Sequence, residues 1–229
     1  MKKIIFIFLM IFTVALCACD EGNRGNANAP GKGGIITPGA SKESFYDYMA
    51  SLKAENGTTT VFNLALSGGV NQNISYTVSY ENDCASGSVT DGGTCEFKDL
   101  YLSGAETFYN NAVKDGALEG NLNKIAFKTP SALFTLNDST VKELYVKYNG
   151  DGTITYTPYI YEGKVKTAIG ALQNQFEFTE DVLSLEFITD YLGSKTVINV
   201  GLSAKYKNTD EVVDIKLRVT YLKTIKTID

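Results

Sequence analysis

The feature that most constrains this chain of 229 residues is a regular alternation of apolar and polar side chains near its C-terminus. From Ile198 to Tyr206, and again from Val213 to Tyr221, every second residue is apolar, and a polar turn at 207–210 separates the two runs. A β-strand directs successive side chains to opposite faces, so each run predicts a strand with one buried face. Together they predict an antiparallel hairpin over 196–206 and 211–222.

The same alternation predicts strands along most of the remaining chain, with Gly, Asn and Asp at the turns between them. The expected strands cover 59–66, 74–80, 95–102, 124–128, 132–136, 141–148, 153–161, 164–168, 172–178 and 182–188. Two helices are expected as well. Apolar residues at helical spacing predict one at 41–57, and the capping-box spacing of Ser103 and Glu106 predicts a shorter one at 103–116.

About a dozen short strands without alternating strand–helix units predict an all-β fold. We expect an antiparallel, meander-rich β-sandwich with one or two short helices, built either as one large sandwich or as two packed Ig-like sandwiches. In the second case the folded part would divide into residues 41–136, which include the longer helix, and residues 137–229, which include the C-terminal hairpin.

The first 19 residues predict where the protein is sent. Lys2 and Lys3 precede an uncharged run over 4–16, which is shorter than the roughly 20 residues of a membrane span and is typical of a signal peptide. The run ends in Leu16-Cys17-Ala18-Cys19, which resembles the lipobox of bacterial lipoproteins. This resemblance implies cleavage of residues 1–18, diacylation of the Cys19 sulfur and acylation of the new amine. An ordinary secretory signal is the alternative, but it would prefer a small residue in place of Leu16.

Residues 20–40 are dense in Gly, Asn, Pro and Ala, and they predict a flexible tether with a reach of about 25 Å behind the lipidated cysteine. Loss of Lys2 and Lys3 with the signal peptide reduces the 21 Lys and Arg residues to 19 against 26 Asp and Glu, a formal net charge of −7. Such a chain is not expected to bind nucleic acid, and acyl chains rather than charge must hold it to a membrane. We expect a lipid-anchored protein of the bacterial cell envelope, at the outer membrane or cell surface or else at the inner membrane.

Cys84 and Cys95 are the cysteines that remain once Cys17 is removed and Cys19 is acylated. An exported chain meets oxidising conditions, so the pair predicts a structural disulfide that would stabilise the fold by about 3 kcal/mol. A redox-active pair is the alternative, but it would normally have Cys-x-x-Cys spacing.

The residues that usually carry catalysis are scarce. The chain has no His, which excludes Ser-His and Cys-His nucleophile pairs and His zinc sites. Ser139 and Lys142 have Ser-x-x-Lys spacing, but the motifs that accompany it in serine acyltransferases are missing. Residues 149–152 match part of a calcium loop without its downstream Glu, and they predict a hairpin turn instead. A further group of acids is interpreted as the solvated face of strands: Glu177, Glu180, Asp181, Glu186 and Asp190. We expect no catalytic residue, metal or cofactor.

Tyrosines in the segment 155–161 are the candidate binding residues. Strand alternation exposes either Tyr156 or the pair Tyr159 and Tyr161, and Pro158, which lacks an N–H, favours an edge strand. Exposed tyrosines favour binding because they offer an aromatic face and a hydroxyl at little cost in entropy. We therefore expect a non-catalytic module that contacts protein or glycan. The alternatives are a periplasmic envelope-assembly factor, or an envelope enzyme or enzyme inhibitor.

Replacing the lipobox cysteine tests the predicted anchor. Cys19→Ala removes the sulfur that would carry the diacylglycerol, so we expect the variant to lose incorporation of a labelled fatty acid and to leave the membrane fraction. Cys17→Ala, which changes the neighbouring cysteine, should keep both properties. Fatty-acid labelling that survives in Cys19→Ala would contradict the lipobox assignment.

Overall fold

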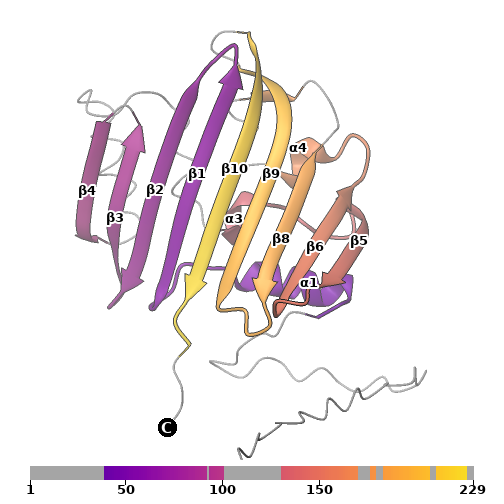
Figure 1. Cartoon of the computed structure of the whole chain (residues 1–229), viewed down its shortest axis with the longest axis horizontal. Helices are drawn as coiled ribbons and strands as arrows, with labels where there is room; N and C mark the ends of the chain where they lie inside the picture. The colour runs from indigo at the N-terminus through magenta and orange to yellow at the C-terminus, as the bar shows by residue number, and fades with distance from the viewer. Residues whose placement is uncertain are drawn as a thin grey trace, which may run out of the picture. The chain divides into compact units, whose positions relative to one another are not determined.

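A computed structural model describes residues 39–91, 93–100, 130–169, 176–178, 183–206 and 210–225 (Figure 1). The chain divides into Met1–Gly34 and Ile35–Asp229, and every described residue belongs to the second unit. Its strands are β1 (Thr58–Gly68), β2 (Gln72–Glu81), β3 (Cys84–Asp91), β4 (Gly93–Leu100), β5 (Val141–Tyr148), β6 (Thr153–Ile160), β7 (Phe176–Phe178), β8 (Ser184–Asp190), β9 (Lys195–Tyr206) and β10 (Val212–Lys223). Its helices are α1 (Lys42–Ser51), α3 (Pro130–Leu133) and α4 (Val165–Ala168). The fold is all-β with a few short helices, as predicted.

All ten strands belong to one antiparallel sheet with the order β4-β3-β2-β1-β10-β9-β8-β6-β5, and β7 pairs separately with β9. The early strand β1 pairs with the late strand β10 from Thr58↔Lys223 to Gly68↔Val213. Residues before and after position 137 therefore share one sheet, which leaves no boundary between two sandwiches there. In the part of the chain that is described, helices and not a second sheet pack on the buried face.

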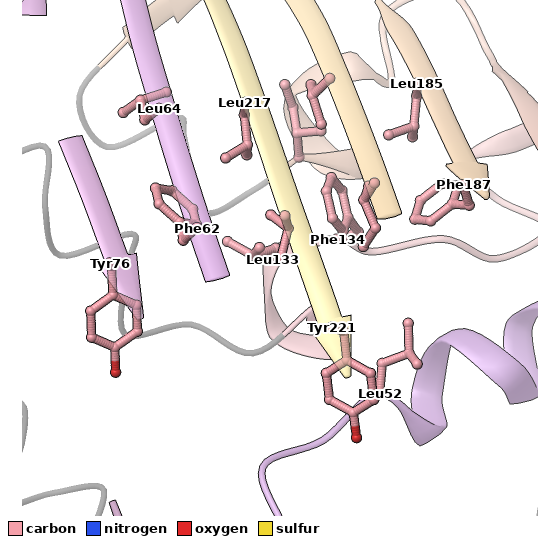
Figure 2. Close-up of a cluster of buried hydrophobic side chains, with 14 of the residues drawn as sticks. Leu52, Phe62, Leu64, Tyr76, Leu133, Phe134, Leu185, Phe187, Leu217 and Tyr221 are labelled. Carbon is pink, nitrogen blue, oxygen red and sulfur yellow. The ribbon is translucent and has the colours of Figure 1, made fainter. Parts of the chain in front are cut away.

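One face of the sheet, the inner face, carries the buried core, and α1 and α3 pack on the part of it that β6 and β8 form. Phe45 of α1 stacks on Tyr156 of β6, with ring centroids 5.1 Å apart, and meets Phe187 of β8 edge-on at 5.2 Å. Phe134, which follows α3, meets the same Phe187 ring at 5.6 Å. Figure 2 shows side chains of β1, β8, β10 and the α3 segment gathered on this face. The aromatic contacts fix α1 and α3 against β6 and β8.

A buried polar contact fixes the same helix to β8 and β9. The hydroxyl of Tyr48 in α1 lies 2.7 Å from Thr189 Oγ1 and also contacts Thr196 Oγ1. Thr189 and Thr196 are direct partners across β8 and β9. A buried hydroxyl needs a hydrogen-bond partner. The contact of Tyr48 with Thr189 and Thr196 therefore fixes the position of α1 along β8 and β9.

The helix expected at 41–57 is present as α1, although it ends at Ser51. The expected strands 132–136 and 164–168 are wrong, because the first begins within α3 and continues as irregular chain and the second forms α4. Their buried residues follow helical spacing, with Leu133 and Phe134 after Pro130, and Ala168 and Ile169 after Val165. Strand β3 was not expected from the sequence. The expected elements 103–116 and 124–128 lie outside the described residues.

Buried tyrosines make the fold sensitive to alkaline pH. Burial raises the pKa of Tyr80 to about 12, and burial together with a hydrogen bond to Asp138 raises the pKa of Tyr46 to about 12. Burial also raises the pKa of four further tyrosines: Tyr48, Tyr76, Tyr156 and Tyr221. Tyrosine in an unfolded chain has a pKa of about 10. The folded state therefore binds these protons more tightly, and that stabilisation is present below about pH 10 and lost as the pH rises toward 12.

We therefore expect the buried tyrosines to ionise together with unfolding between about pH 10 and 12. Tyrosinate absorbance and near-UV circular dichroism, recorded along one pH titration, measure the two events. Both signals should change in the same pH interval. Ionisation of all 14 tyrosines near pH 10 with unchanged near-UV dichroism would contradict the expectation.

Candidate functional site

The other face of the sheet, the outer face, carries a row of polar side chains across its centre. Direct cross-strand register joins Ser75 of β2 to Asn63 of β1, Asn63 to Arg218 of β10, Arg218 to Asn199 of β9, and Asn199 to Glu186 of β8. Ser75 Oγ donates to Asn63 Oδ1 at 3.1 Å, and Asn199 Nδ2 donates to Glu186 Oε2 at 3.2 Å. We call these five residues the polar row.

A second row of mostly small residues makes the face concave beside the polar row. Ala65 of β1 pairs with Lys216 of β10, and Lys216 pairs with Gly201 of β9, which lies opposite Ser184 of β8. The second row and the polar row without Glu186 line a groove of about 540 Å³, which is within the range of small-ligand sites. A Cβ atom added to Gly201 would meet only Ser184 Cβ, at 3.6 Å. The groove therefore has a floor on which a flat ligand could lie close to the backbone.

Two positively charged side chains line this groove. Lys216 and Arg218 both line it, and their neighbours on β10 at positions 217 and 219 point to the buried face. Among the described residues the one ion pair joins Lys223 to Glu55 at 2.5 Å, so neither groove cation forms an ion pair with a described acid. Next to Arg218, the Asn63 and Asn199 side chains are already oriented by their bonds to Ser75 and Glu186. The arrangement can donate several hydrogen bonds to an anionic or hydroxyl-rich ligand.

The candidate tyrosines divide between core and surface. Tyr156 is fully buried, and its hydroxyl donates to Gly39 O at 2.9 Å, so it is a core residue and not a binding residue. Tyr159 and Tyr161 keep 55% and 41% of their surface exposed. Tyr159 lies on the outer face, opposite Glu143 of β5. Across three strand spacings, its Cα lies roughly 15 Å from that of Arg218.

The expectation that Pro158 marks an edge strand needs correction. Its strand, β6, lies between β5 and β8, and the edges of the sheet are β4 and β5. The pairing of β6 with β8 ends at Tyr156, so Pro158 lies beyond the last pair and interrupts no ladder there.

The remaining candidates have structural roles. Ser139 Oγ donates to Asn137 Oδ1 at 2.6 Å within the turn before β5. Asp151 accepts from Thr153 Oγ1 at 2.7 Å in the β5–β6 turn, and this hydrogen bond lowers the pKa of the Asp151 carboxyl. Asp190 accepts from the Ser194 amide at 2.8 Å in the β8–β9 turn. No three metal-ligating side chains cluster in the ranges that the structure covers. Glu180, Asp181 and the lipobox cysteine, Cys19, lie outside those ranges.

The two cysteines expected to form a disulfide are separated by the strand register. Cys95 of β4 lies opposite Val89 of β3, five positions along the strand from Cys84. Five residues of strand span about 17 Å, whereas a disulfide needs Cα atoms within about 7 Å. Cys84 is accordingly a free cysteine in this structure. A Cys84–Cys95 bond would require a different pairing of β3 with β4.

Comparisons with known proteins give no relative for this chain. No family model matches it, and no curated protein or solved structure does. Among the described residues, no helix has the length and apolar character needed to cross a membrane.

The state of Cys84 distinguishes the register seen here from the disulfide expected from sequence. We expect Cys84 of the purified full chain, unfolded in denaturant without reductant, to react with a maleimide. Cys84→Ala should remove that label, which identifies its source by mass spectrometry. Labelling of Cys84 only after reduction would show that it is bridged and would contradict the β3–β4 register.

Proposed function

We propose that this protein is a lipid-anchored binding module of the bacterial cell envelope, and that its ligand is a glycan bound in the outer-face groove. The single observation that carries the binding proposal is the groove of about 540 Å³, in which Asn63, Asn199 and Arg218 stand side by side on three adjacent strands. The lipobox resemblance at Cys19 and the tether predicted over 20–40 support the location, at the outer membrane or cell surface or at the inner membrane.

The chemistry of the groove favours a glycan over a protein. Side chains that point into it are amides, hydroxyls, cations and small residues, and the outward apolar residue is Ala65. Protein interfaces usually concentrate their binding energy in large aromatic or apolar anchors, which this lining does not offer. Amide and guanidinium groups suit the closely spaced hydroxyls of a sugar, each of which donates and accepts.

The charges of the groove favour an anionic glycan. Lys216 and Arg218 are adjacent on the same face of β10, and an extended ligand that carries carboxylate or phosphate groups would pair with both. Tyr159, on the same face toward β5, could stack on a more distant sugar ring. An extended, charged polymer therefore fits the face better than a compact uncharged sugar.

Binding to a panel of purified anionic and neutral polysaccharides tests this proposal. The full chain, held in detergent, should bind an anionic member, and Arg218→Ala should weaken that binding about tenfold or more, because a hydrogen bond to a charged group contributes roughly 1.5–3 kcal/mol. Asn199→Ala should weaken it less. Added salt should weaken the binding of the unsubstituted chain.

Lys205→Ala is the matched control, since Lys205 is a cation on β9 that does not line the groove. It should leave affinity unchanged, and all three variants should unfold at nearly the temperature of the parent chain, because substitutions of exposed or half-buried side chains on the outer face change stability little. Binding that Arg218→Ala leaves intact would contradict the proposed site. If Tyr159→Ala then removed the binding, the glycan contact would lie at the exposed tyrosines and not in the groove.

A further inference from the structure

Strand β5 is an edge of the sheet with an exposed aromatic residue at its centre. Within the described ranges β5 pairs only with β6, and Tyr145 keeps 65% of its surface exposed. An open edge presents unpaired N–H and C=O groups and is a template for another strand. The side chains of β5 show which strand would fit.

The backbone groups that β5 presents outward can be assigned from its pairing. The Asn149 amide donates to Thr153 O at 2.8 Å, and this pair continues the register of Tyr148↔Ile154. Hydrogen-bonded residues alternate along an antiparallel pair, so position 147 and Tyr145 also bond to β6. Leu144, position 146 and Tyr148 therefore direct their N–H and C=O groups to the open edge.

A lysine of the helix α1 limits this open stretch at one end. Lys42 Nζ donates to Val141 O at 3.1 Å and to Lys142 O at 2.8 Å. Position 142 is also the extra residue where the β5–β6 register shifts. The backbone that remains free to pair runs from Glu143 to Tyr148.

We propose that β5 pairs in antiparallel fashion with β5 of a second copy of this chain, about a two-fold axis at Tyr145. In this register Leu144 lies opposite Val146 of the second copy, and Glu143 lies opposite Lys147. Leu144 and Val146 present the outward backbone groups, so they exchange N–H···O=C bonds on both sides of the axis.

The charges of β5 select this register. A pairing that continues the sheet must keep inner side chains opposite inner ones, so alternative registers differ by two residues. A two-residue shift places Glu143 opposite either Tyr145 or Asn149, and Lys147 opposite either Val141 or Tyr145. Only the axis at Tyr145 gives opposite charges as partners, and the two-fold symmetry repeats that pair. No described acid or base forms an ion pair with Glu143 or Lys147 in the single chain.

The same register covers the surface that β5 leaves exposed. On the outer face the two Tyr145 rings meet between the two Glu143–Lys147 pairs, at a non-hydrogen-bonded position where Cα atoms lie about 4.5 Å apart and side chains are closest. On the inner face, the half-buried Leu144 and Val146 of each copy pack on those of the other. A two-fold interface of this kind is closed, because each copy uses the same edge.

Disulfide trapping tests the register in the membrane. Full chains carrying Cys84→Ser and Cys95→Ser receive either Tyr145→Cys or Glu143→Cys, and membranes are oxidised and analysed on non-reducing gels. Tyr145→Cys should form a linked dimer, since the two Cα atoms lie within the range of a disulfide. Glu143→Cys, on the same strand and face, should not, because its equivalents lie about 14 Å apart. Equal cross-linking of both variants, or none in Tyr145→Cys, would overturn the proposal.

Charge exchange provides a second test that does not depend on a new cysteine. In sedimentation of the full chain in detergent, Glu143→Lys should raise the dimer dissociation constant about tenfold or more, because two attractive pairs become repulsive. Lys147→Glu should do the same. The double variant E143K/K147E restores opposite charges and should restore the dimer. Unchanged self-association in Glu143→Lys, or no recovery in the double variant, would overturn the assignment.

Discussion

The pairing of β1 with β10 is the interaction on which the rest of this structure depends. It joins a strand that begins at Thr58 to one that ends at Lys223, through eleven consecutive residue pairs. Without it the sheet would separate into β4-β3-β2-β1 on one side and β10-β9-β8-β6-β5 on the other. Closing so long a segment of chain costs entropy before the pairing repays it, so this contact is also expected to form late in folding.

The same register sets both the core and the candidate site. Because side chains alternate strictly along a strand, the register that buries Phe62 against Val219 also places Asn63 opposite Arg218 on the other face. A slip of one residue would expose the core residues and bury the cation. The groove therefore needs no loop or lid of its own, because its position follows from the hydrophobic pattern of β1 and β10.

Local patterns predicted the elements that are stabilised locally. The β9–β10 hairpin was evident because both strands alternate cleanly across one turn, and α1 was evident because Phe45, Tyr48 and Met49 follow helical spacing. In contrast, β3 was missed because Ala, Ser and Gly dominate it. Its strand conformation is stabilised by pairing with β2 and β4, and not by the strand propensity of its own residues. The segments of α3 and α4 are so short that the spacing of their apolar residues does not distinguish a helix from a strand.

The candidate site was beyond sequence reasoning for a different reason. Asn63, Asn199 and Arg218 occupy polar positions of predicted strands, but nothing in the sequence shows that three strands bring them into one row. Tyrosines were the candidate binding residues because an aromatic residue can be identified from the sequence without knowing its neighbours. In the structure, Tyr156 is buried and does not lie on the surface. The disulfide expected of Cys84 and Cys95 was inferred from spacing, which ignores that a paired strand holds its residues far apart.

The β5 edge of the sheet has features that bear on how the molecule associates. Natural sheets protect edges with charges, bulges or covering groups, and β5 has all three near its start: Lys142, the register shift there, and the Lys42 contact. That protection stops at Glu143, where the self-complementary stretch begins. An edge that only prevents strand pairing would not require Glu143 and Lys147 to lie at equal distances from Tyr145. The equal distance of Glu143 and Lys147 from Tyr145 favours an edge that pairs with a second copy of itself. Such a dimer would present two grooves on the same face of one continuous sheet, so an extended polymer could engage both.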